Sequence, residues 1–431
     1  MRRSINPCPA ISSLFPTCKI RGTDLMLVGL AWRNIWRQPH RTALSLSSIA
    51  IAGTITVFLL ALQQGAYGTM KESVLKLMDG FAQLQPPGYA DDPDIRKSIS
   101  DSGPLIADLV SLPEVTAATP RAASYAILSN GPQSYGAAIV GIDPAREVKV
   151  SNLASTITRG RYLQPGDEDA VVIGAGLARN LKLNPGDSVT MLGSAQDGSI
   201  AADILKVTGI FSTGSPALDR QVVEMPLVHF QQDFAMNGSI NLIAVSGEHL
   251  STINAAIPSL EKIARRNDLV ARDWTQLEPA LHDVILLDGS FSALLYVSLV
   301  IIVVFIILNT LLMSVLERTR EFGMLMAIGM KPRQIGRMVW LELLFLAGSG
   351  SAIAIAAGSA ITAWAATQGI PFPGAEALFS QWNMPSTLYP QLTLLSATAG
   401  PLAILVAVAI AGFIPYARVR RLEPVTAMRS A

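Results

Sequence analysis

Four long runs of apolar and small residues contain no charged side chain. They lie at 42–62, 291–316, 343–367 and 392–416 and have 21, 26, 25 and 25 residues. A helix rises about 1.5 Å per residue, so about 20 residues cross a hydrocarbon core of about 30 Å. The pattern therefore predicts four transmembrane helices.

Apolar positions at helical spacing continue beyond the first run and precede the second. After the first run they are Met70, Val74, Leu75, Met78, Phe81 and Ala82, and Pro86 and Pro87 would end the helix. Before the second run they are Leu277, Leu281, Val284, Ile285 and Leu286. Both spans are therefore predicted to extend as stalk helices, with ordinary surface helices of the intervening domain as the alternative.

Between the stalks, short apolar runs bounded by Gly, Pro and Asp alternate with helical patterns. The runs predict strands at 137–142, 170–173, 188–192, 204–210 and 242–245. The helical patterns lie at 105–112, 176–181, 228–236 and 251–264. Pro-Gly-Asp occurs at 165–167 and at 185–187, and each copy indicates a turn. This segment predicts a mixed α/β domain between the first and second spans.

The segment before the first span combines tryptophan with basic residues. Trp32 and Trp36 alternate with Arg33 and Arg37 at helical spacing, which is typical of a helix at the membrane interface. A simple positive anchor is the alternative. Residues 1–25 lack the apolar stretch of a signal peptide and are predicted to be disordered, and Met26 is a plausible natural start.

Charge predicts the orientation of the spans. Half of the residues are apolar and 15% are charged, against about 25% in ordinary globular chains. The segment 65–290 holds 17 Lys and Arg against 26 Asp and Glu, whereas basic residues gather in 1–41, in 317–339 and after residue 417. Positive charges beside spans stay in the cytoplasm. Both termini and the loop 317–339 are therefore predicted to be cytoplasmic, and the acidic domain and the loop 368–391 to be outside.

These patterns together divide the chain into ten parts. They are a disordered extension (1–25), an interfacial helix (26–41), the first span (42–64), the outer domain with its stalks (65–290), the second span (291–316), the loop (317–339), the third span (340–367), an outer loop (368–391), the fourth span (392–416) and a cytoplasmic tail (417–431).

Catalytic signatures are absent from the sequence. It has no phosphate-binding loop of the G-x-x-x-x-G-K-[ST] type and no H-E-x-x-H motif. Its four histidines are scattered, its two cysteines, Cys8 and Cys18, precede the first span, and the spans carry no ionisable group for ion-coupled transport. We therefore expect no catalytic residue, no metal ion, no cofactor bound by this chain and no nucleic-acid partner.

The loop after the second span has the pattern of an amphipathic helix. Its apolar residues include Phe322 and Leu325, beside the charged Arg318 and Glu321. Such a helix can lie among lipid headgroups or dock in the groove of a partner, and its mixed charges favour a protein partner. In the third span, Gly350, Ala354 and Gly358 recur every four residues, which lets another helix approach closely.

The same loop carries a specific resemblance. Residues 317–329, ERTREFGMLMAIG, resemble the motif E-R-x-R-E-[IF]-G-x-L-x-A-x-G of the FtsX-like permeases, the membrane subunits of MacB-type ABC transporters. The stretches AWRNIWRQPHRT before the first span and PYARVRRLEPVTAMR at the end are also similar to that family. Residues 171–192, VVIGAGLARNLKLNPGDSVTML, resemble its lipoprotein-releasing LolC/LolE branch.

The resemblance implies a non-catalytic permease in the bacterial inner membrane, with four spans and a MacB-like periplasmic domain. It implies a dimeric ABC ATPase as a separate polypeptide that binds ATP and Mg²⁺, and a second permease chain, either identical or paralogous. The residues that would couple to the ATPase are Glu317, Arg318, Arg320, Glu321, Phe322, Gly323, Leu325, Ala327, Gly329 and Lys331.

Three functions are compatible with this family. The permease could transmit ATP-driven movement to the periplasm and extract lipoproteins or other lipid-like cargo from the membrane. It could instead be a regulatory scaffold that activates a periplasmic enzyme, or it could export a small amphiphile or a peptide. A further periplasmic partner is compatible with each of the three.

Overall fold

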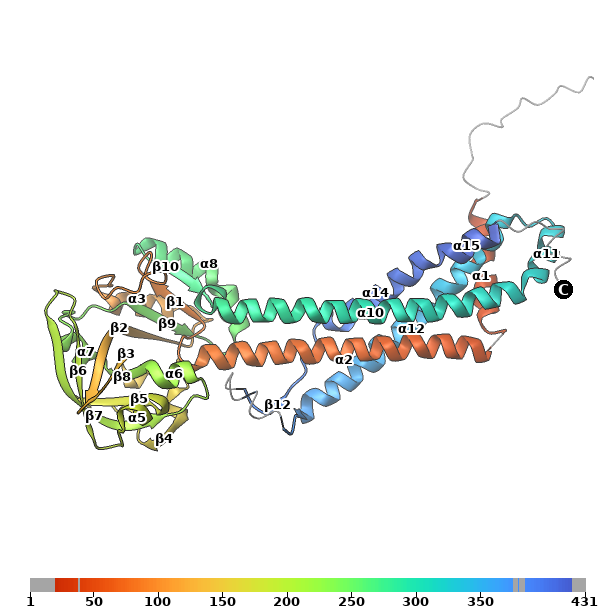
Figure 1. Cartoon of the computed structure of the whole chain (residues 1–431). Helices are drawn as coiled ribbons and strands as arrows, with labels where there is room; N and C mark the ends of the chain where they lie inside the picture. The colour runs from red at the N-terminus through yellow and green to blue at the C-terminus, as the bar shows by residue number, and fades with distance from the viewer. Residues whose placement is uncertain (1–19, 38, 375–378, 380–383, 421–431) are drawn as a thin grey trace, which may run out of the picture. The chain divides into compact units, whose positions relative to one another are not determined.

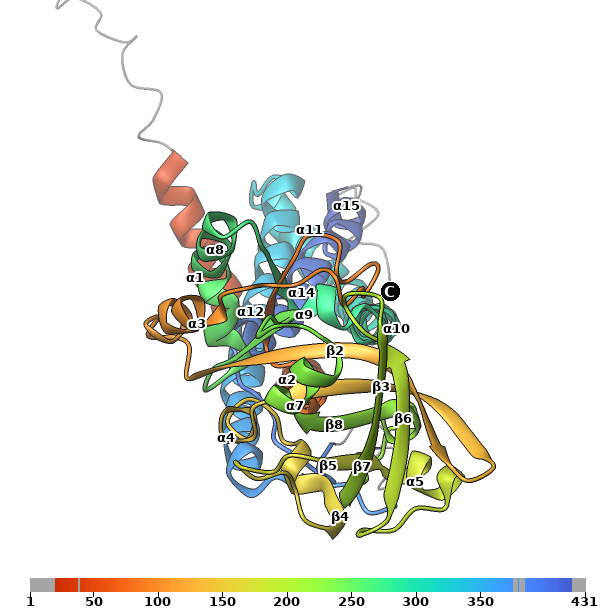
Figure 2. The same cartoon turned by 90° about the vertical axis from the view of Figure 1, so that its left-hand side faces the viewer.

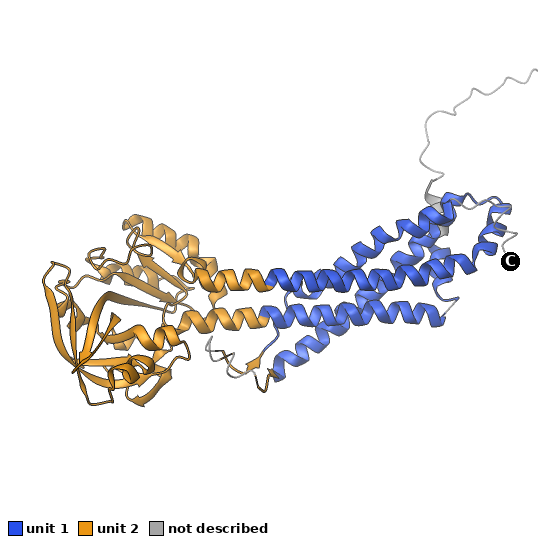
Figure 3. Ribbon diagram, viewed as in Figure 1, with its two compact units in different colours: residues 1–64, 289–369, 389–431 blue, residues 65–288, 370–388 orange. Residues whose placement is uncertain are grey.

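The computed structural model describes residues 20–37, 39–374, 379 and 384–420, and these divide into two compact units (Figure 3). The first unit is helical and comprises residues 1–64, 289–369 and 389–431. The second unit, residues 65–288 and 370–388, is a mixed α/β domain. Helices α2 and α10, labelled in Figure 1, contribute residues to both units, as the colours of Figure 3 show.

Seven helices of the described residues build the helical unit. They are α1 (Ile20–Ile35), α2 (Pro39–Leu77), α10 (Pro279–Glu317), α11 (Thr319–Ala327), α12 (Pro332–Gln368), α14 (Leu394–Ala411) and α15 (Phe413–Arg420). Four stretches of the described residues are long and apolar enough to span a membrane: α2, α10, α12, and α14 with α15. The first strand of the α/β domain follows α2, so the chain has one span before the domain and three after it.

Small residues let α12 pack closely against α2. A methyl group built on Gly350 would lie 2.7 Å from Ile49 Cγ2, and one on Gly358 would lie 2.8 Å from Val57 Cβ. Ala354 lies between them on the same face, and its Cβ is 2.5 Å from the position that a side chain on Gly53 would occupy. The three small residues thus occupy the line of closest approach between the two helices.

The α/β domain is built on a ten-stranded sheet (Figure 2). The strands are β1 (Ala82–Gln85), β2 (Ala117–Asn130), β3 (Gln133–Ile142), β4 (Ile157–Gly160), β5 (Ala170–Gly174), β6 (Ser188–Ser194), β7 (Ile200–Phe211), β8 (Val222–Pro226), β9 (Leu242–Ser246) and β10 (Val270–Asp273). Their order is β10-β1-β9-β2-β3-β8-β5-β7-β4, and β6 pairs with both β2 and β7. That double pairing closes β2, β3, β8, β5, β7 and β6 into a ring. The pairs β3–β8 and β5–β7 are parallel, and the other pairs are antiparallel.

Helices cover the sheet and enclose two main apolar cores. They are α3 (Ser102–Val110), α4 (Pro144–Glu147), the 3₁₀ helix η1 (Leu153–Thr156), α5 (Ala175–Leu181), α6 (Pro216–Gln221), α7 (Leu227–Asp233), α8 (Leu250–Arg266) and α9 (Trp274–Leu277). The larger core joins the closed ring to α5 and α7, and the second joins β1 and β9 to α3 and α8. A separate short pair, β11 (Ile370–Pro371) and β12 (Thr387–Leu388), also belongs to this unit.

Both Pro-Gly-Asp sequences form turns. Gly166 and Gly186 have φ angles of +94° and +101°, which favour glycine. In each turn the aspartate accepts a hydrogen bond from the backbone N–H three residues earlier, Asp167 from Gln164 and Asp187 from Asn184, both at 2.8 Å. The second proline-flanked turn leads directly into β6.

Three sequence-based boundaries are wrong. Helix α1 begins at Ile20, so residues 20–25 are helical rather than disordered; residues 1–19 lie outside the described residues. The predicted interfacial helix 26–41 is divided, because α1 ends at Ile35 and Pro39, whose fixed φ suits a first turn, begins α2. The predicted stalk face ends at Leu77 instead of continuing to Ala82, because Gly80 takes φ +78° and its N–H bonds to the Leu75 carbonyl.

A buried ion pair lies inside the α/β domain. Arg121 of β2 bonds to both carboxylate oxygens of Glu147 at 2.6 and 3.1 Å, and their side chains are 4% and 0% exposed. Nearby, the Tyr162 hydroxyl donates to Glu224 at 2.6 Å. Burial, and then the neighbouring charge of Glu147, raise the pKa of Glu224 to about 8. These groups connect β2, β8, α4 and the loop before β5.

Candidate functional site

The connection between α10 and α12 folds into the separate helix α11. Helix α10 ends at Glu317, and α11 spans Thr319–Ala327. Gly329 then takes φ +108°, a conformation that side chains disfavour. Pro332 opens α12, and the Gln334 side chain accepts a hydrogen bond from the Lys331 N–H at 2.9 Å. The loop motif thus forms a short helix bounded by a glycine turn.

One face of α11 is buried. Phe322 is 1% exposed and Gly323 is also buried, while Leu325 is half-buried. Phe322 belongs to an apolar cluster that joins α11 to α1, α10, α12 and α15, and whose other members are Ala31, Val315, Ile335, Met338, Val339 and Val419. This cluster anchors α11 to the four helices around it.

The opposite face and the end of α11 are exposed. Ile328 is 84% exposed and Met324 is 51% exposed. Arg320, Ala327, Gly329 and Lys331 are exposed as well. A large apolar side chain in this position is shielded by no other described part of the chain. We call Arg320, Met324, Ala327, Ile328, Gly329 and Lys331 the exposed α11 surface.

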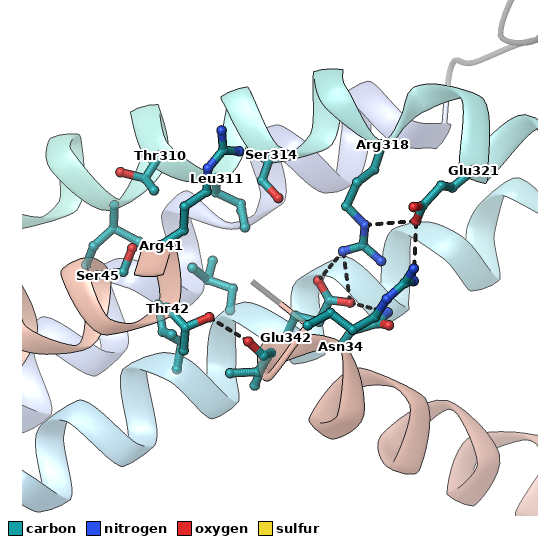
Figure 4. A pocket seen from close by; sticks show the side chains of 15 residues that line it. Asn34, Arg41, Thr42, Ser45, Thr310, Leu311, Ser314, Arg318, Glu321 and Glu342 are labelled. Carbon is teal, nitrogen blue, oxygen red and sulfur yellow. Dashed lines mark hydrogen bonds and ion pairs between the residues drawn. The ribbon is translucent and has the colours of Figure 1, made fainter. Parts of the chain in front are cut away.

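A polar network fixes the start of α11 (Figure 4). Arg318 bonds to Glu342 of α12 at 3.2 and 3.4 Å and to Glu321 at 3.4 Å. Glu342 also accepts a hydrogen bond from Asn34 Nδ2 of α1 at 2.6 Å. The Arg318 guanidinium lies 5.3 Å from the Phe322 ring centroid. One arginine therefore connects α11 to α12 and, through Glu342, to α1.

Two further ion pairs connect the same helices. Arg41 of α2 makes a bidentate pair with Glu317 at the end of α10, with Nη2 to Oε1 at 2.6 Å. Arg37 reaches Glu321 at 3.5 Å. Both pairs are partly exposed, so solvent weakens the attraction within each. Together with the bonds of Arg318, these two pairs give the start of α11 and the end of α10 several polar contacts with neighbouring helices.

A cavity of about 180 Å³ adjoins this network (Figure 4). Its polar lining includes Arg41, Arg318 and Glu342, and its apolar lining includes Leu311 and Leu343. Helices α1, α2, α10, α11 and α12 all contribute to it. The described lining residues include no nucleophile paired with a base; they place several ion pairs beside a cavity.

The tryptophans near the start of α2 are exposed. Trp32 is 46% exposed and Trp36 is 61% exposed, and their rings contact edge to face at 6.3 Å. Trp32 also contacts Phe345 of α12 at 5.6 Å. Arg33 and Arg37 are exposed beside them. On α1, the buried Ala31 and the half-buried Asn34 face the bundle instead.

The structure brings most of the predicted coupling residues together but separates them by exposure. Arg318, Glu321, Phe322, Gly323 and Leu325 join α11 to its neighbours, whereas Arg320, Ala327, Gly329 and Lys331 face outward. Glu317, at the end of α10, is exposed and pairs with Arg41 of α2. Sequence reasoning missed Asn34, Arg41 and Glu342. The signal for Glu342 was available, since it is the acidic residue next to the apolar run that starts at Leu343.

Comparisons with known proteins decide the family. Residues 293–424 match the FtsX-like permease C-terminal family. Residues 42–263, just over half of the chain, match the MacB-like periplasmic core domain. The chain belongs to the MacB-type FtsX-like permeases. It is therefore an ABC transporter permease that spans the membrane, with the α/β domain inserted after the first span.

Relatives within this family have different named roles. The lipoprotein-releasing transmembrane protein LolC of Neisseria meningitidis is 21% identical over 74% of this chain and 76% of its own. The macrolide export ATP-binding/permease protein MacB of Hyphomonas neptunium is 25% identical over 94% of this chain. The pyoverdine export protein PvdT of Pseudomonas fluorescens is 24% identical over 96% of this chain. The chain spans about three fifths of the length of MacB and PvdT.

Two solved structures are similar to part of the chain. The periplasmic region of MacB from Actinobacillus actinomycetemcomitans is 18% identical and covers 47% of this chain and 94% of its own, with a TM-score of 0.34. The extracellular domain of the transporter YknZ from Gram-positive bacteria covers 44% of this chain and 98% of its own at 17% identity, with a TM-score of 0.33.

Proposed function

We propose that this permease couples ATP hydrolysis by a partner ATPase to mechanical work on lipid-embedded cargo. In this proposal the exposed α11 surface docks in a groove of the ATPase, and both ends of the described chain lie in the cytoplasm. The basic residues near α1, α11 and α15 support that orientation. The ATPase binds ATP and Mg²⁺, and this chain supplies no catalytic group.

The two-faced construction of α11 carries the proposal. The 84% exposed Ile328 projects from a helix whose other face is held by Phe322 and Arg318. An apolar side chain flanked by charges and held on a rigid support is the arrangement by which a helix docks in a groove. A push on the exposed α11 surface would pass to α12 through Glu342 and to α2 through the pair Arg41–Glu317.

Helices α2 and α10 would carry that movement along the chain. Each is one unbroken helix of 39 residues that contributes to the helical unit and to the α/β domain. Within the helical unit, Gln63 of α2 bonds to Ser292 and Tyr296 of α10 at 2.7 and 3.2 Å. Within the domain, Tyr67 of α2 bonds to Asp288 of α10. The two helices would therefore move as a pair.

A second permease chain would complete the membrane part. Only 11% of the most apolar window of α10 is buried by the chain, against 28–39% in the other three spans. Its exposed residues are large and apolar, and include Leu294, Leu295, Ile302 and Phe305. Lipid or a second copy, identical or paralogous, would cover this face.

Docking of the ATPase on the exposed α11 surface is tested by replacing Ile328. Ile328→Asp should leave insertion and thermal stability unchanged and should abolish co-purification of the ATPase from detergent. Ile200→Asp is the matched control, because Ile200 of β7 is 75% exposed in the other unit. If the ATPase still co-purifies with Ile328→Asp in normal yield, α11 is not the docking element.

Lipoprotein or another amphiphile is the proposed cargo. Support comes from the relative named as lipoprotein-releasing and from spans without ionisable residues, which offer no polar path through the membrane. Depletion of the ATPase should leave lipoproteins at the inner membrane, as measured by fractionation and mass spectrometry. An unchanged distribution would remove lipoprotein as the cargo.

Export of a small amphiphile is the second candidate, because MacB and PvdT are named as exporters and align with nearly the whole chain. It predicts that loss of the permease raises sensitivity to, or retention of, a small compound while lipoproteins stay correctly distributed. Regulation of a periplasmic enzyme predicts a hydrolase without lipid in the detergent pull-down. Lipoprotein fractionation, compound retention and the pull-down together therefore separate the three functions.

A further inference from the structure

Three side chains of the α/β domain converge in a way that the scattered histidines of the sequence did not suggest. His229 and Asp233 lie one helical turn apart on α7, and Asp203 lies on the adjacent strand β7. His229 Nε2 is 2.7 Å from Asp203 Oδ2 and 3.5 Å from Asp233 Oδ2. One ligand atom from each of the three residues falls within 4.8 Å of the other two.

The cluster has more hydrogen-bond acceptors than donors. Both carboxylates approach the same ring nitrogen, which carries at most one proton. Asp203, at 2.7 Å, is the nearer acceptor for such a proton. Asp233 Oδ2 is fully buried and is left without a hydrogen-bond donor among the described residues. A buried carboxylate oxygen in this position is costly unless something else satisfies it.

The charges do not balance either. The groups that act on Asp233 are His229, Asp203 and Asp169, of which only His229 can be positive. The side chains of His229 and Asp233 are 17% and 14% exposed, so solvent screens the repulsion only partly. Two carboxylates thus face one imidazole, so the cluster is short of positive charge.

We propose that His229, Asp203 and Asp233 bind a divalent transition-metal ion, with Zn²⁺ as the best fit. Imidazole nitrogen with carboxylate oxygen is a donor set that zinc accepts. Zinc holds such atoms at about 2.0–2.2 Å in a tetrahedron, which places the ligand atoms about 3.3 Å apart. The observed separations of 2.7 and 3.5 Å bracket this value. Three protein ligands leave the fourth position to water.

The ion would fasten α7 to the closed ring of strands. Phe230 and Phe234 on the same stretch of chain are fully buried and stack at 4.3 Å in the main core. The segment after α7 contains Ala235 and Asn237 at φ values of +53° and +51°, which side chains rarely adopt. A metal bond between α7 and β7 would stabilise the domain beside this strained turn.

The test uses the full chain in detergent after chelation and dialysis. Wild type should bind one Zn²⁺ per chain by calorimetry, show the visible spectrum of tetrahedral Co²⁺, and unfold at a higher temperature with Zn²⁺ than without. His229→Gln and Asp233→Asn should weaken Zn²⁺ binding about 100-fold or more and abolish the thermal gain. His249→Gln is the control, because His249 is exposed and meets a single carboxylate, Glu72.

Stability without metal separates this proposal from a purely structural ion pair. Removing the buried charge in Asp233→Asn should leave the metal-free protein at least as stable as wild type. An ion pair with His229 predicts the opposite, a less stable metal-free variant, together with no saturable Zn²⁺ binding by wild type. Either of these results, or equal Zn²⁺ binding by wild type and Asp233→Asn, overturns the metal site.

Discussion

The α/β domain and the helical unit each contain a buried arginine–glutamate pair, and the two pairs are built differently. In the domain, Arg121 and Glu147 are 4% and 0% exposed and lie among neighbours of the main sheet. In the helical unit, Arg318 and Glu342 are 15% and 11% exposed and line a cavity of about 180 Å³. The first pair is enclosed by packed protein, and the second has space beside it.

We expect this difference to decide whether an arginine can leave its glutamate for another partner. A fully buried charge that loses its partner has no solvent to replace it, and the loss costs about 3–5 kcal/mol. A charge beside a cavity can be reached by water, and it has other partners within reach: Arg318 also contacts Glu321, and Glu342 also contacts Asn34. We therefore expect the helical pair to change partners more easily than the pair in the domain.

The largest expected effect is the loss of the enclosed arginine. Arg121→Met should destabilise the α/β domain by about 3–5 kcal/mol, because Glu147 is left buried and unpaired. For a domain of this size that is about 10 °C or more in Tm, measured by differential scanning fluorimetry of the full chain. Adding Glu147→Gln should restore part of the loss. A change below about 1 kcal/mol in Arg121→Met would show that the pair is not enclosed.

A smaller effect is expected from pH acting on Glu224 beside the same pair. Its folded pKa of about 8 lies above its usual value of 4.5, so the folded domain holds a proton that the unfolded chain has released. This stability is complete below about pH 4.5 and is lost as pH rises through about 8. Tm should fall by about 5 °C between pH 6 and 8.5. Glu224→Gln, which cannot release a proton, should flatten that decline, and an equal slope in both proteins would contradict the shift.

The Arg318–Glu342 pair should tolerate the same substitution better. Arg318→Met should cost about 1–2 kcal/mol, since water in the adjoining cavity can reach Glu342. Its functional effect should be larger: the ATPase still co-purifies through the exposed α11 surface, but stimulation of ATP turnover by cargo is lost. Arg318→Lys should keep part of it. A destabilisation as large as that of Arg121→Met would show that the two pairs are equivalent.

Sequence patterns foretold the helices of the membrane part far better than their ends. Uncharged runs identify spans because lipid excludes charge over their whole length. Helix ends depend on single residues, as Gly80 shows by ending α2 before the apolar periodicity does. Strand β2 escaped prediction because its 14 residues include Pro120 and few large apolar side chains; its pairing with β3, β6 and β9 defines it.

For the site around α11, the sequence predicted only the features that depend on residues close together in the chain. The buried and exposed faces of α11 follow from helical periodicity within nine residues. The contact between Asn34 and Glu342 does not, because the two residues are 308 positions apart and meet only when α1 packs on α12. The cluster of His229 with Asp203 is similar, since it needs β7 beside α7. Long-range pairing carries the chemistry that periodicity cannot show.

The smallest effects are expected from the neutral side chains that donate to the two glutamates, Asn34 to Glu342 and Thr119 to Glu147. Asn34→Ala removes a hydrogen bond of 2.6 Å to Glu342 and should cost about 1 kcal/mol. Thr119→Val removes a weaker contact of 3.4 Å to Glu147, which keeps its two bonds to Arg121, and should cost under about 0.5 kcal/mol. Combining each variant with its arginine variant in a double-mutant cycle measures the energetic coupling between the neutral donor and the arginine.

If the Arg318–Glu342 pair is exchangeable, Asn34→Ala should cost more in the Arg318→Met background than in wild type. The reason is that Asn34 is then the direct side-chain partner left to Glu342 among the described residues. Equal costs in the two backgrounds would mean that Asn34 and Arg318 hold Glu342 independently, and the helical pair would then be as fixed as the pair in the domain.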